Sequence, residues 1–269
     1  MLLEDALFRT KRFLLGKNRV RRCRTYCIGI AKSGTHSIAG MFSRNVLSGH
    51  ETRALELTEK ILAWQDGSIS DAQMTAWLHV RDRQLGLEVD SSPQNIRILD
   101  FLLKEFPDAR FILTTRDCYS WLESVLNHDF YFQNIDERWL KWRRAQHDAK
   151  IVHAPEEQSL KEKNLYPIES YLTGWDKHHR EVLAKVPAEK LLIVRVDEIK
   201  KRALEIADFA HLPRYSIQIE DTHKFKNIQK VPLLRDIDRD FLTRKVNQHC
   251  GEMMARFFPE IKSAADARY

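Results

Sequence analysis

The first residues with evident chemical potential lie between Gly29 and His36. Gly29 and Gly34 have the G-x-x-x-x-G spacing of a phosphate-binding loop, between an apolar run and a helical pattern. Such a loop surrounds phosphate oxygens with backbone N–H groups at the start of a helix. Thr35 and His36 replace the usual Lys-Ser/Thr pair, and the lysine lies earlier, at Lys32. The ammonium is therefore displaced and the hydroxyl ligand for magnesium is lost, which favours a phosphate-bearing donor over an ordinary ATPase site.

A second group with phosphate-binding chemistry follows the apolar run RFILTT at 110–115. Arg116 is expected at the end of this strand, where a guanidinium can bind a phosphate through two parallel hydrogen bonds. Ser120 and Ser124 come one and two helical turns later, so Ser124 is expected on the helix face next to the strand end. A lone arginine here also fits a salt bridge, and its combination with the glycine loop is what favours the phosphate site.

Apolar runs and helical patterns alternate along the chain and predict an α/β fold. We expect strands at 25–30, just before the polar stretch 90–93, at 110–115 and at 191–196, and helices at 35–47, 53–65, 70–85, 96–106, from about 117, and at 168–185, 199–210 and 235–257. The alternation predicts a three-layer, P-loop-like arrangement with a central parallel sheet flanked by helices. Ligands then lie at the carboxyl ends of the strands.

The chain length fits one large α/β domain or two small ones, and we interpret residues 1–269 as a single domain. Residues 1–24 are expected to form a basic N-terminal arm. Residues 129–166 are polar, aromatic and irregular in pattern, and are expected to form a lid or an acceptor-binding insertion. The basic residues at 19–24 predict a solvated arm; a peripheral contact with a membrane surface or an acidic partner is the second interpretation.

Composition limits the classes of protein that need consideration. The 269 residues carry a formal net charge of +6, with 30% charged and 43% hydrophobic residues, which is typical of a globular protein and compatible with an anionic ligand. The sequence contains no recognised nucleic-acid-binding motif, and no stretch approaches the ~20 apolar residues of a membrane span. Its four cysteines form no C-x-x-C pair, which favours a reducing, cytoplasmic location.

The sequence AKSGTHS at 31–37 resembles the 5′-phosphosulfate loop of sulfotransferases that use 3′-phosphoadenosine 5′-phosphosulfate (PAPS). Arg116 followed by Ser124 is similar to the 3′-phosphate site of that family. The segments 107–117 and 191–199 also resemble parts of its core.

In the segments 31–37 and 107–117 and just after them, three positions depart from the family pattern: Ala31 and Cys118 stand where proline is common, and His36 stands where threonine is usual. Ala31 changes the stiffness of the loop without removing a donor. If the threonine hydroxyl is needed, Ser37 or the His36 imidazole must replace it.

The resemblance implies in-line, metal-independent transfer of a sulfuryl group from PAPS to a hydroxyl acceptor, with 3′,5′-adenosine bisphosphate as the second product. It implies that Lys32 and loop N–H groups stabilise the charge that develops on the leaving phosphate. The residues implied to bind the donor are Lys32, Ser33, Gly34, Thr35, His36, Ser37, Arg116, Ser124 and, from the basic segment 222–230, Lys226.

Transfer to an alcohol needs a general base, and three side chains are candidates. Asp90 leads, because Asp90-Ser91-Ser92-Pro93 resembles the Glu-Lys-Ser-Pro/Ala stretch of glycan-type sulfotransferases, with Asp in place of Glu and Ser91 in place of Lys. The alternative role of Asp90 is a helix N-cap or a turn carboxylate. His36 is the second candidate, since it lies in the loop and titrates near neutrality. His128 is the third.

The Asp90 segment favours a carbohydrate or glycolipid as the acceptor, while a lipid, a phenol or a peptide tyrosine stays open. The dense aromatic residues at 119–142 are expected to line the acceptor side or to form ordinary core. Two other functions compete with sulfuryl transfer. One is a P-loop kinase or nucleoside triphosphatase with Asp197 as a magnesium carboxylate, which the displaced lysine disfavours. The other is a non-catalytic nucleotide-binding protein on the same fold.

Overall fold

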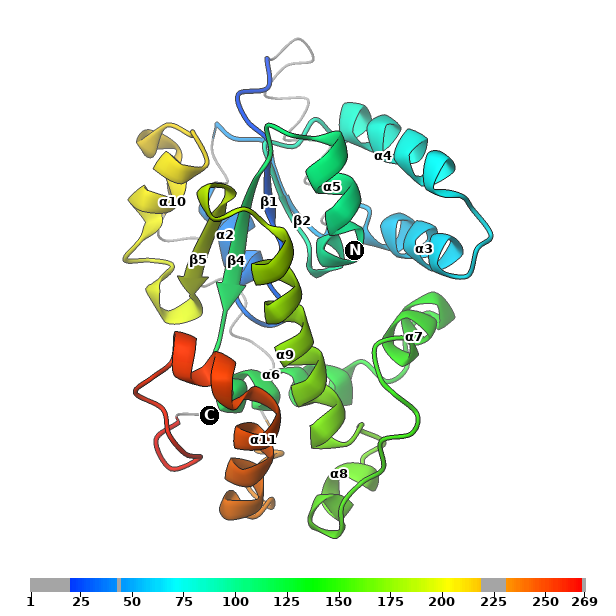
Figure 1. The fold of residues 1–269 in the computed structure, drawn as a ribbon, viewed down its shortest axis with the longest axis vertical. Coiled ribbons are helices and arrows are strands. Elements are labelled where there is room, and N and C mark those ends of the chain that lie inside the picture. Colours follow the sequence, from blue (N-terminus) through cyan, green and yellow to red (C-terminus); the bar gives the residue numbers. More distant parts are fainter. Residues whose placement is uncertain (1–19, 43–44, 219–230, 268–269) are drawn as a thin grey trace. The chain divides into compact units, whose positions relative to one another are not determined.

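The structure is a computed structural model that describes residues 20–42, 45–218 and 231–267. Contacts between Cα atoms divide the chain into two compact units (Figure 1). The first unit contains residues 1–115 and 185–226, and the second contains residues 116–184 and 227–269. Organisation of the whole chain as a single domain stays a prediction.

The first unit holds all the strands found in the described part of the chain. Its elements are β1 (Thr25–Cys27), α2 (Thr35–Met41), β2 (Ser48–His50), α3 (Ala54–Gln65), α4 (Asp71–Leu85), β3 (Val89–Ser91), η1 (Pro93–Ile98), α5 (Leu99–Glu105), β4 (Arg110–Thr115), η3 (Ala188–Lys190), β5 (Leu191–Arg195), η4 (Val196–Glu198), α10 (Ala203–Phe209) and η5 (Arg214–Ser216). The strands form one parallel sheet in the order β2-β3-β1-β4-β5. The predicted α/β fold with a central parallel sheet is therefore confirmed.

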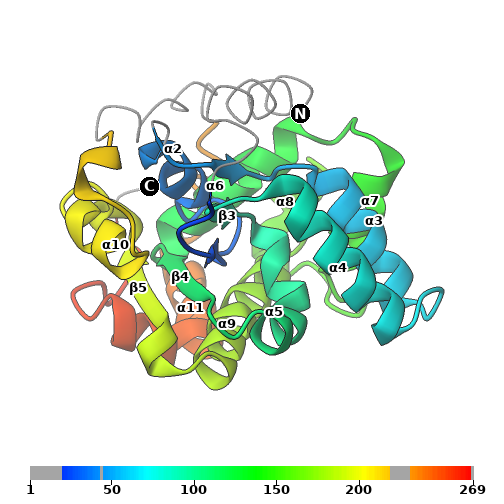
Figure 2. The same ribbon diagram turned by 90° about the horizontal axis from the view of Figure 1, so that it is seen from above.

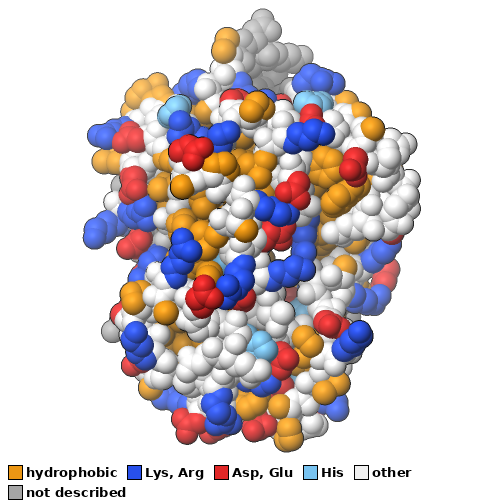
Figure 3. Space-filling model, viewed as in Figure 1, with side chains coloured by type: hydrophobic (Ala, Val, Ile, Leu, Met, Phe, Trp, Pro, Cys, Tyr) orange, Lys and Arg blue, Asp and Glu red, His pale blue; other side chains and the backbone are white. Residues whose placement is uncertain are grey.

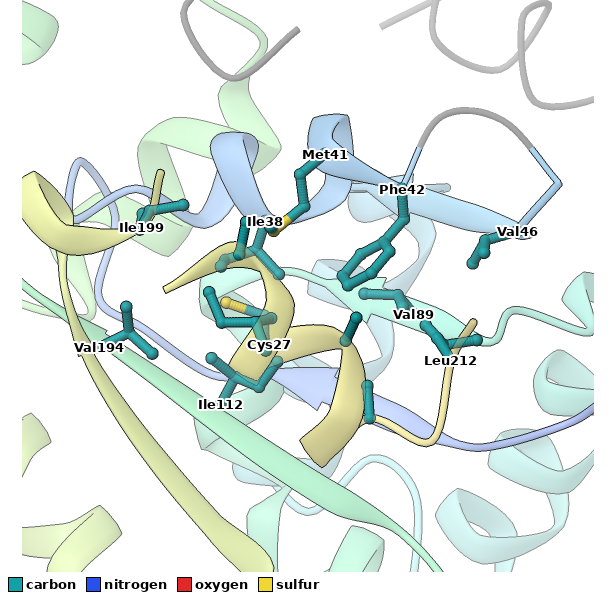
Figure 4. Close-up of a cluster of buried hydrophobic side chains, with 14 residues drawn as sticks. Cys27, Ile38, Met41, Phe42, Val46, Val89, Ile112, Val194, Ile199 and Leu212 are labelled. Carbon is teal, nitrogen blue, oxygen red and sulfur yellow. The ribbon is translucent and has the colours of Figure 1, made fainter. Parts of the chain in front are cut away.

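Helices cover both faces of this sheet, which makes the first unit three-layered. On one face, side chains of α2 and α10 pack on β1, β3, β4 and β5 in a fully buried cluster that includes Cys27, Ile38 and Ile112 (Figure 4). On the other face, the ring of Tyr26 stacks on Phe111 and contacts Phe106, which follows α5. Burial of these side chains fixes which way each strand faces, because successive residues of a strand alternate between faces. Figures 1 and 2 show α10 beside β5 and α3 and α4 at the opposite edge of the sheet.

The second unit is helical in its described part. Its elements are α6 (Cys118–Tyr131), α7 (Glu137–Arg144), η2 (Pro155–Glu157), α8 (Gln158–Lys161), α9 (Ile168–Lys185, whose last residue belongs to the first unit) and α11 (Arg239–Phe257). Glu123 on α6 is buried and accepts hydrogen bonds from the backbone N–H groups of Leu233 and Leu234 at 3.1 and 2.9 Å. This carboxylate therefore anchors the chain that leads into α11. The segment 129–166, expected to be irregular, contains α7, η2 and α8.

Strand β2 was not predicted, and the helix expected at 35–47 ends at Met41. Ser48 explains both differences. Its hydroxyl donates to the carbonyls of Ala39 and Phe42 at 2.9 and 3.1 Å, which satisfies acceptors at the end of α2 and joins that end to the new strand. A three-residue edge strand with a serine and a glycine has too little apolar pattern to be recognised from sequence.

The described part of the basic arm is not a solvated tail. Arg22 makes an ion pair of 2.6 Å with Glu88, which is 1% exposed, and Arg24 pairs with Asp82 and Asp108. Arg21 also reaches Asp82. These guanidiniums neutralise carboxylates of the first unit, so the solvated-arm expectation is wrong for residues 21–24. Residues 1–19 lie outside the described residues.

None of the described helices combines the length and the apolar character needed to cross a membrane. Basic and acidic side chains are interspersed over the face shown in Figure 3.

Candidate active site

The loop after β1 turns through two left-handed residues. Lys32 has φ +69° and Gly34 has φ +107°, and Ser33 lies between them. Ser33 is fully buried: its hydroxyl hydrogen-bonds the carbonyl of Ile30 at 2.6 Å and the hydroxyl of Thr114 on β4 at 2.9 Å. Alternating right- and left-handed residues turn successive N–H groups toward one side, which forms a concave anion-binding nest. The backbone N–H of Ser33 also donates to the carbonyl of Ile30, at 3.1 Å. The loop N–H groups expected to contribute to a ligand are therefore those after Ser33, at the start of α2.

Two glycines are required by the shape of this loop. A Cβ on Gly29 would lie 1.9 Å from the hydroxyl of Thr114, so only glycine lets the loop approach β4. A Cβ on Gly34 would lie 2.8 Å from Cδ1 of Ile199, in a backbone conformation that L-residues rarely adopt. The G-x-x-x-x-G spacing therefore has a geometric cause in this chain.

Thr35, the first residue of α2, is held by the neighbouring strands β2 and β3. The hydroxyl of Ser91 donates to the carbonyl of Thr35 at 2.6 Å. The hydroxyl of Thr35 lies 3.2 Å from Nε2 of His50, the last residue of β2. The loop and the start of the helix are thus bonded to three strands, β2, β3 and β4, at their carboxyl ends.

Two histidines lie together beside the loop. The rings of His36 and His50 are 4.8 Å apart between centroids, at an interplanar angle of 59°. Burial lowers the pKa of His36, and the Lys32 ammonium lowers it further. Burial, followed by the charges of His36 and Lys32, lowers the pKa of His50 to about 3. Both imidazoles are therefore neutral at physiological pH and are available as hydrogen-bond donors and acceptors.

Asp90 on β3 is paired within the fold. Its Oδ2 accepts a hydrogen bond of 2.7 Å from Nη1 of Arg81 on α4, and the two side chains are 3% and 8% exposed. Asp90 is in register with Tyr26, on the sheet face opposite Cys27 and α2. Its other oxygen, Oδ1, is buried and has no hydrogen-bond partner among the described residues. The next residue, Ser91, is the one that reaches the loop.

Arg116 is the first residue of the second unit and follows directly on β4. Its Nε donates to the hydroxyl of Ser120 at 3.0 Å, and that hydroxyl in turn bonds Asp117, which caps α6. The indole of Trp175 on α9 donates to the carbonyl of Arg116 at 3.1 Å. Burial lowers the pKa of Arg116. The guanidinium is thus half-buried, and a hydrogen bond at Nε fixes its position. It forms no ion pair with a carboxylate in the described part of the chain. A half-buried cation without such a partner is suited to bind an anion.

The other predicted site residues have the following placements. Ser124 is half-buried on α6, one turn beyond Ser120. His128 is another turn on, with Nδ1 3.3 Å from Oδ1 of Asp129 and its ring stacked on Phe132. Lys226 lies outside the described residues.

Asp197, the carboxylate of the alternative triphosphatase interpretation, pairs with Arg195 at 3.2 Å. Its side chain is 61% exposed.

The expected acceptor region divides into core and surface. Tyr119 and Trp121 are buried, as the core interpretation predicts, whereas Tyr131 and Phe132 are 42% and 41% exposed.

A cavity of about 520 Å³ lies farther along the segment 129–166 and extends to Pro167. Its walls include Arg144, His147, Ile151, Val152, Lys161 and Tyr166. The ring of His147 lies parallel to Tyr166 at 3.6 Å, so the cavity combines an aromatic wall with basic side chains.

Sequence reasoning missed several residues of the site. His50 was missed because β2 was not predicted. The contacts of Thr114 and Ser91 with the loop were also missed. Each residue is polar and lies at the end of an apolar strand, and this pattern could have indicated that its side chain bonds the loop. Ser120 was placed on α6 by its spacing but was not assigned the contact that it makes with Arg116.

The chain is similar to known sulfotransferases in sequence pattern and in fold. The family model described as "Sulfotransferase domain" matches residues 26–198. A crystal structure of a sulfotransferase from Alicyclobacillus acidocaldarius is 14% identical, with a TM-score of 0.53, and the similarity covers 93% of this chain and 100% of that one.

A sulfotransferase from Mycobacterium avium is 10% identical, with a TM-score of 0.49, over 95% of this chain and 82% of that one. The sulfotransferase domain of the Synechococcus PCC 7002 olefin synthase is 14% identical, with a TM-score of 0.40, over 84% of each chain. No curated protein sequence matches the chain.

Proposed function

The chain belongs to the sulfotransferase domain family, and on this premise we propose that it transfers a sulfuryl group from PAPS to a hydroxyl group of a carbohydrate or glycolipid. The observation that carries the proposal is the loop at 29–37. Two of its residues have left-handed backbone conformations, and the displaced lysine is one of them. The reaction needs positioning and charge stabilisation and no metal, which suits a loop without the Lys-Ser/Thr pair.

Lys32 and the N–H groups from Gly34 to Ser37 are assigned to the 5′-phosphosulfate. Ser33 is assigned to positioning the loop, because its hydroxyl and its N–H both bond the carbonyl of Ile30. As the sulfur–oxygen bond to the bridging phosphate oxygen breaks, its electrons stay on the phosphate. Lys32 then interacts more strongly with the leaving group than with the ground state, which lowers the barrier. The hydrogen bonds of Ser33 and Thr35 to the strands hold the loop in this geometry before the donor arrives.

We assign the general base to His36 and keep Asp90 as the alternative. His36 is half-buried, neutral and part of the loop, so it is placed to receive the hydroxyl proton as the acceptor oxygen bonds to sulfur. Asp90 forms an ion pair with Arg81 and is the register partner of Tyr26 on the neighbouring strand β1. Both contacts support a structural role for Asp90. His128 and Asp129 form the third candidate pair.

Arg116 and Ser124 are assigned to the 3′-phosphate of the donor. The support is the braced, half-buried guanidinium of Arg116 and the position of Ser124 two turns along α6. Lys226 is assigned to the same phosphate from the resemblance alone.

The acceptor is assigned to the second unit. The support is the cavity along the segment 129–166, where an aromatic wall can stack on a sugar ring and Arg144 and Lys161 add positive charge. We place the protein in the cytoplasm, on the strength of its cysteine pattern.

The proposal is tested by comparing two ligands. Calorimetric titration with 3′,5′-adenosine bisphosphate is expected to give tight binding, and ATP with magnesium is expected to bind far more weakly. Transfer of label from [35S]PAPS is then screened against glycans, glycolipids and phenols. Preferential binding of magnesium ATP would support the triphosphatase alternative, and bisphosphate binding without transfer would support a non-catalytic protein.

A further inference from the structure

His50 is a buried histidine beside the loop that the chemistry above does not use. It ends the edge strand β2, so the sheet fixes its backbone, and its side chain faces the first turn of α2. One ring nitrogen, Nε2, lies 3.2 Å from the hydroxyl of Thr35. The ring itself lies 4.8 Å from that of His36. His50 therefore contacts two successive residues of the donor loop.

The second ring nitrogen of His50 has an unusual environment. Nδ1 is buried and has no hydrogen-bond partner among the described residues. An unpaired buried polar atom lowers the stability of the fold, and a phenylalanine or leucine here would avoid that cost. The presence of a histidine here is therefore explained by its two other contacts, the hydrogen bond with Thr35 and the ring contact with His36.

The groups around the pair set its charge. Lys32 on the loop is the cation that both imidazoles sense. Asp90 on β3, paired with Arg81 from α4, faces the other side of the sheet, and Glu51 follows His50 in the chain. A protonated His50 would face a cation and another imidazole in a buried place, so it stays neutral beside the ring of His36.

We propose that His50 is a positioning residue for sulfuryl transfer: it fixes the hydroxyl of Thr35 through Nε2 and holds the ring of His36, in its neutral form, ready to accept the acceptor's proton. This inference rests on the proposed function, because it deepens the role assigned there to His36. Its geometric part, the coupling of the two rings and the threonine, is independent of catalysis.

The chemical step balances as follows. The acceptor oxygen forms a bond to sulfur while the bond from sulfur to the bridging phosphate oxygen breaks. The hydroxyl proton passes to His36, and the electron pair of the broken bond leaves with the phosphate. A proton on His36 then lies near a newly formed negative charge, which stabilises the products. His50 takes no proton in this step.

Two substitutions separate the two contacts. His50→Asn keeps a hydrogen-bonding group near Thr35 and removes the ring from His36. His50→Phe keeps a ring against His36 and removes the hydrogen bond. His79→Asn is the matched control, since His79 is a half-exposed histidine of the same unit that pairs with Glu105.

The first measurement is an NMR titration of the His36 imidazole without donor. In the wild type the pKa of His36 is expected to lie below its ordinary range. His50→Asn exposes the ring and is expected to raise this pKa, while His50→Phe and His79→Asn leave it lowered. If His50→Asn does not fold, His50→Gln serves in its place. An unchanged His36 titration in the folded Asn or Gln variant overturns the proposal, whether or not the protein is active.

The second measurement is the pH profile of kcat/KM with PAPS. The acid limb, which follows protonation of His36, is expected to move to higher pH in His50→Asn. His50→Phe is expected to lower kcat about tenfold without moving the limb, as for loss of one hydrogen bond. Equal losses at every pH in both variants would indicate a merely structural residue and overturn the proposal. Failure of the wild type to bind 3′,5′-adenosine bisphosphate would reject the proposed function and leave the NMR result to decide the His36–His50 coupling.

Discussion

The two groups of residues assigned to phosphates are built differently. In the loop at 29–37, the side chains of Ser33 and Thr35 are bonded to the strands, and we assign backbone N–H groups and Lys32 to the ligand. In the segment 116–124, the backbone is an ordinary capped helix start, and a guanidinium braced at Nε provides the binding group. The contrast teaches that a prebuilt loop suits stabilisation of a transition state, whereas a braced side chain suits binding of the ground state.

Replacing Lys32 by alanine is expected to give the largest effect that distinguishes the loop from the segment 116–124. We expect Lys32→Ala to lower kcat by ~10²-fold or more, because the charge on the leaving phosphate loses its cation. Binding of 3′,5′-adenosine bisphosphate should change much less. Lys104→Ala, at an exposed lysine of the same unit, is the control. Wild-type turnover in Lys32→Ala would remove the lysine from the reaction.

Arg116 should show the opposite pattern. Arg116→Ala is expected to weaken donor binding by ~2–4 kcal/mol, as for loss of a partly desolvated charge-assisted contact. At saturating donor, kcat should stay within a few-fold of the wild type. The control is Arg138→Ala, at an exposed arginine on α7. An unchanged dissociation constant for the donor would mean that Arg116 does not bind the 3′-phosphate. A large effect on kcat alone would mean that Arg116 acts in the transition state, as the loop does.

The prebuilt character of the loop can be measured through stability. Gly34→Ala is expected to lower the free energy of unfolding by ~1–3 kcal/mol, from left-handed strain together with the contact to Ile199. Gly67→Ala is a matched control, because Gly67 also has positive φ, +79°, and a Cβ added there would meet nothing within 4 Å. The difference between the two variants in urea unfolding isolates the steric part. Equal losses would mean that the loop has no tight fit to η4 and the residue after it.

Neutral histidines in the two units predict a dependence of stability on pH. The pKa of His50 and that of His179 are each lowered to about 3, in both cases chiefly by burial. Below an ordinary pKa of about 6.5 the unfolded state binds protons that the folded state does not, so stability falls by about 1.4 kcal/mol per pH unit for each histidine. Stability is therefore full above that pH and declines as the pH falls.

Urea unfolding at several pH values between 7.5 and 5 measures this slope. His50→Asn and His179→Asn should each reduce the slope of the free energy of unfolding against pH by the contribution of one proton. A slope that neither substitution changes would mean that both imidazoles are protonated in the folded protein.

The sequence was sufficient for the parts of the site that depend on local pattern. The loop spacing, the strand before Arg116 and the serine spacing on α6 follow from glycine geometry and from helical and strand periodicity. The parallel sheet followed from the alternation of strands and helices.

What the sequence could not supply depends on contacts between distant residues. Arg81 and Asp90 are an ordinary helix arginine and a strand-end carboxylate until the fold brings them to 2.7 Å. His50 became visible only with β2, whose three residues carry no apolar alternation. The helix α7 was missed because all its side chains remain at least partly exposed, so no apolar face marks it.

The most direct test is a single-turnover measurement with saturating [35S]PAPS and an acceptor identified by the screen, in the wild type and in Lys32→Ala. We predict that the wild type moves the label to the acceptor and forms one equivalent of 3′,5′-adenosine bisphosphate. We predict that Lys32→Ala binds the bisphosphate nearly as well but transfers the label at least about 10²-fold more slowly. Equal single-turnover rates in the two proteins would contradict the assignment of the loop to sulfuryl transfer.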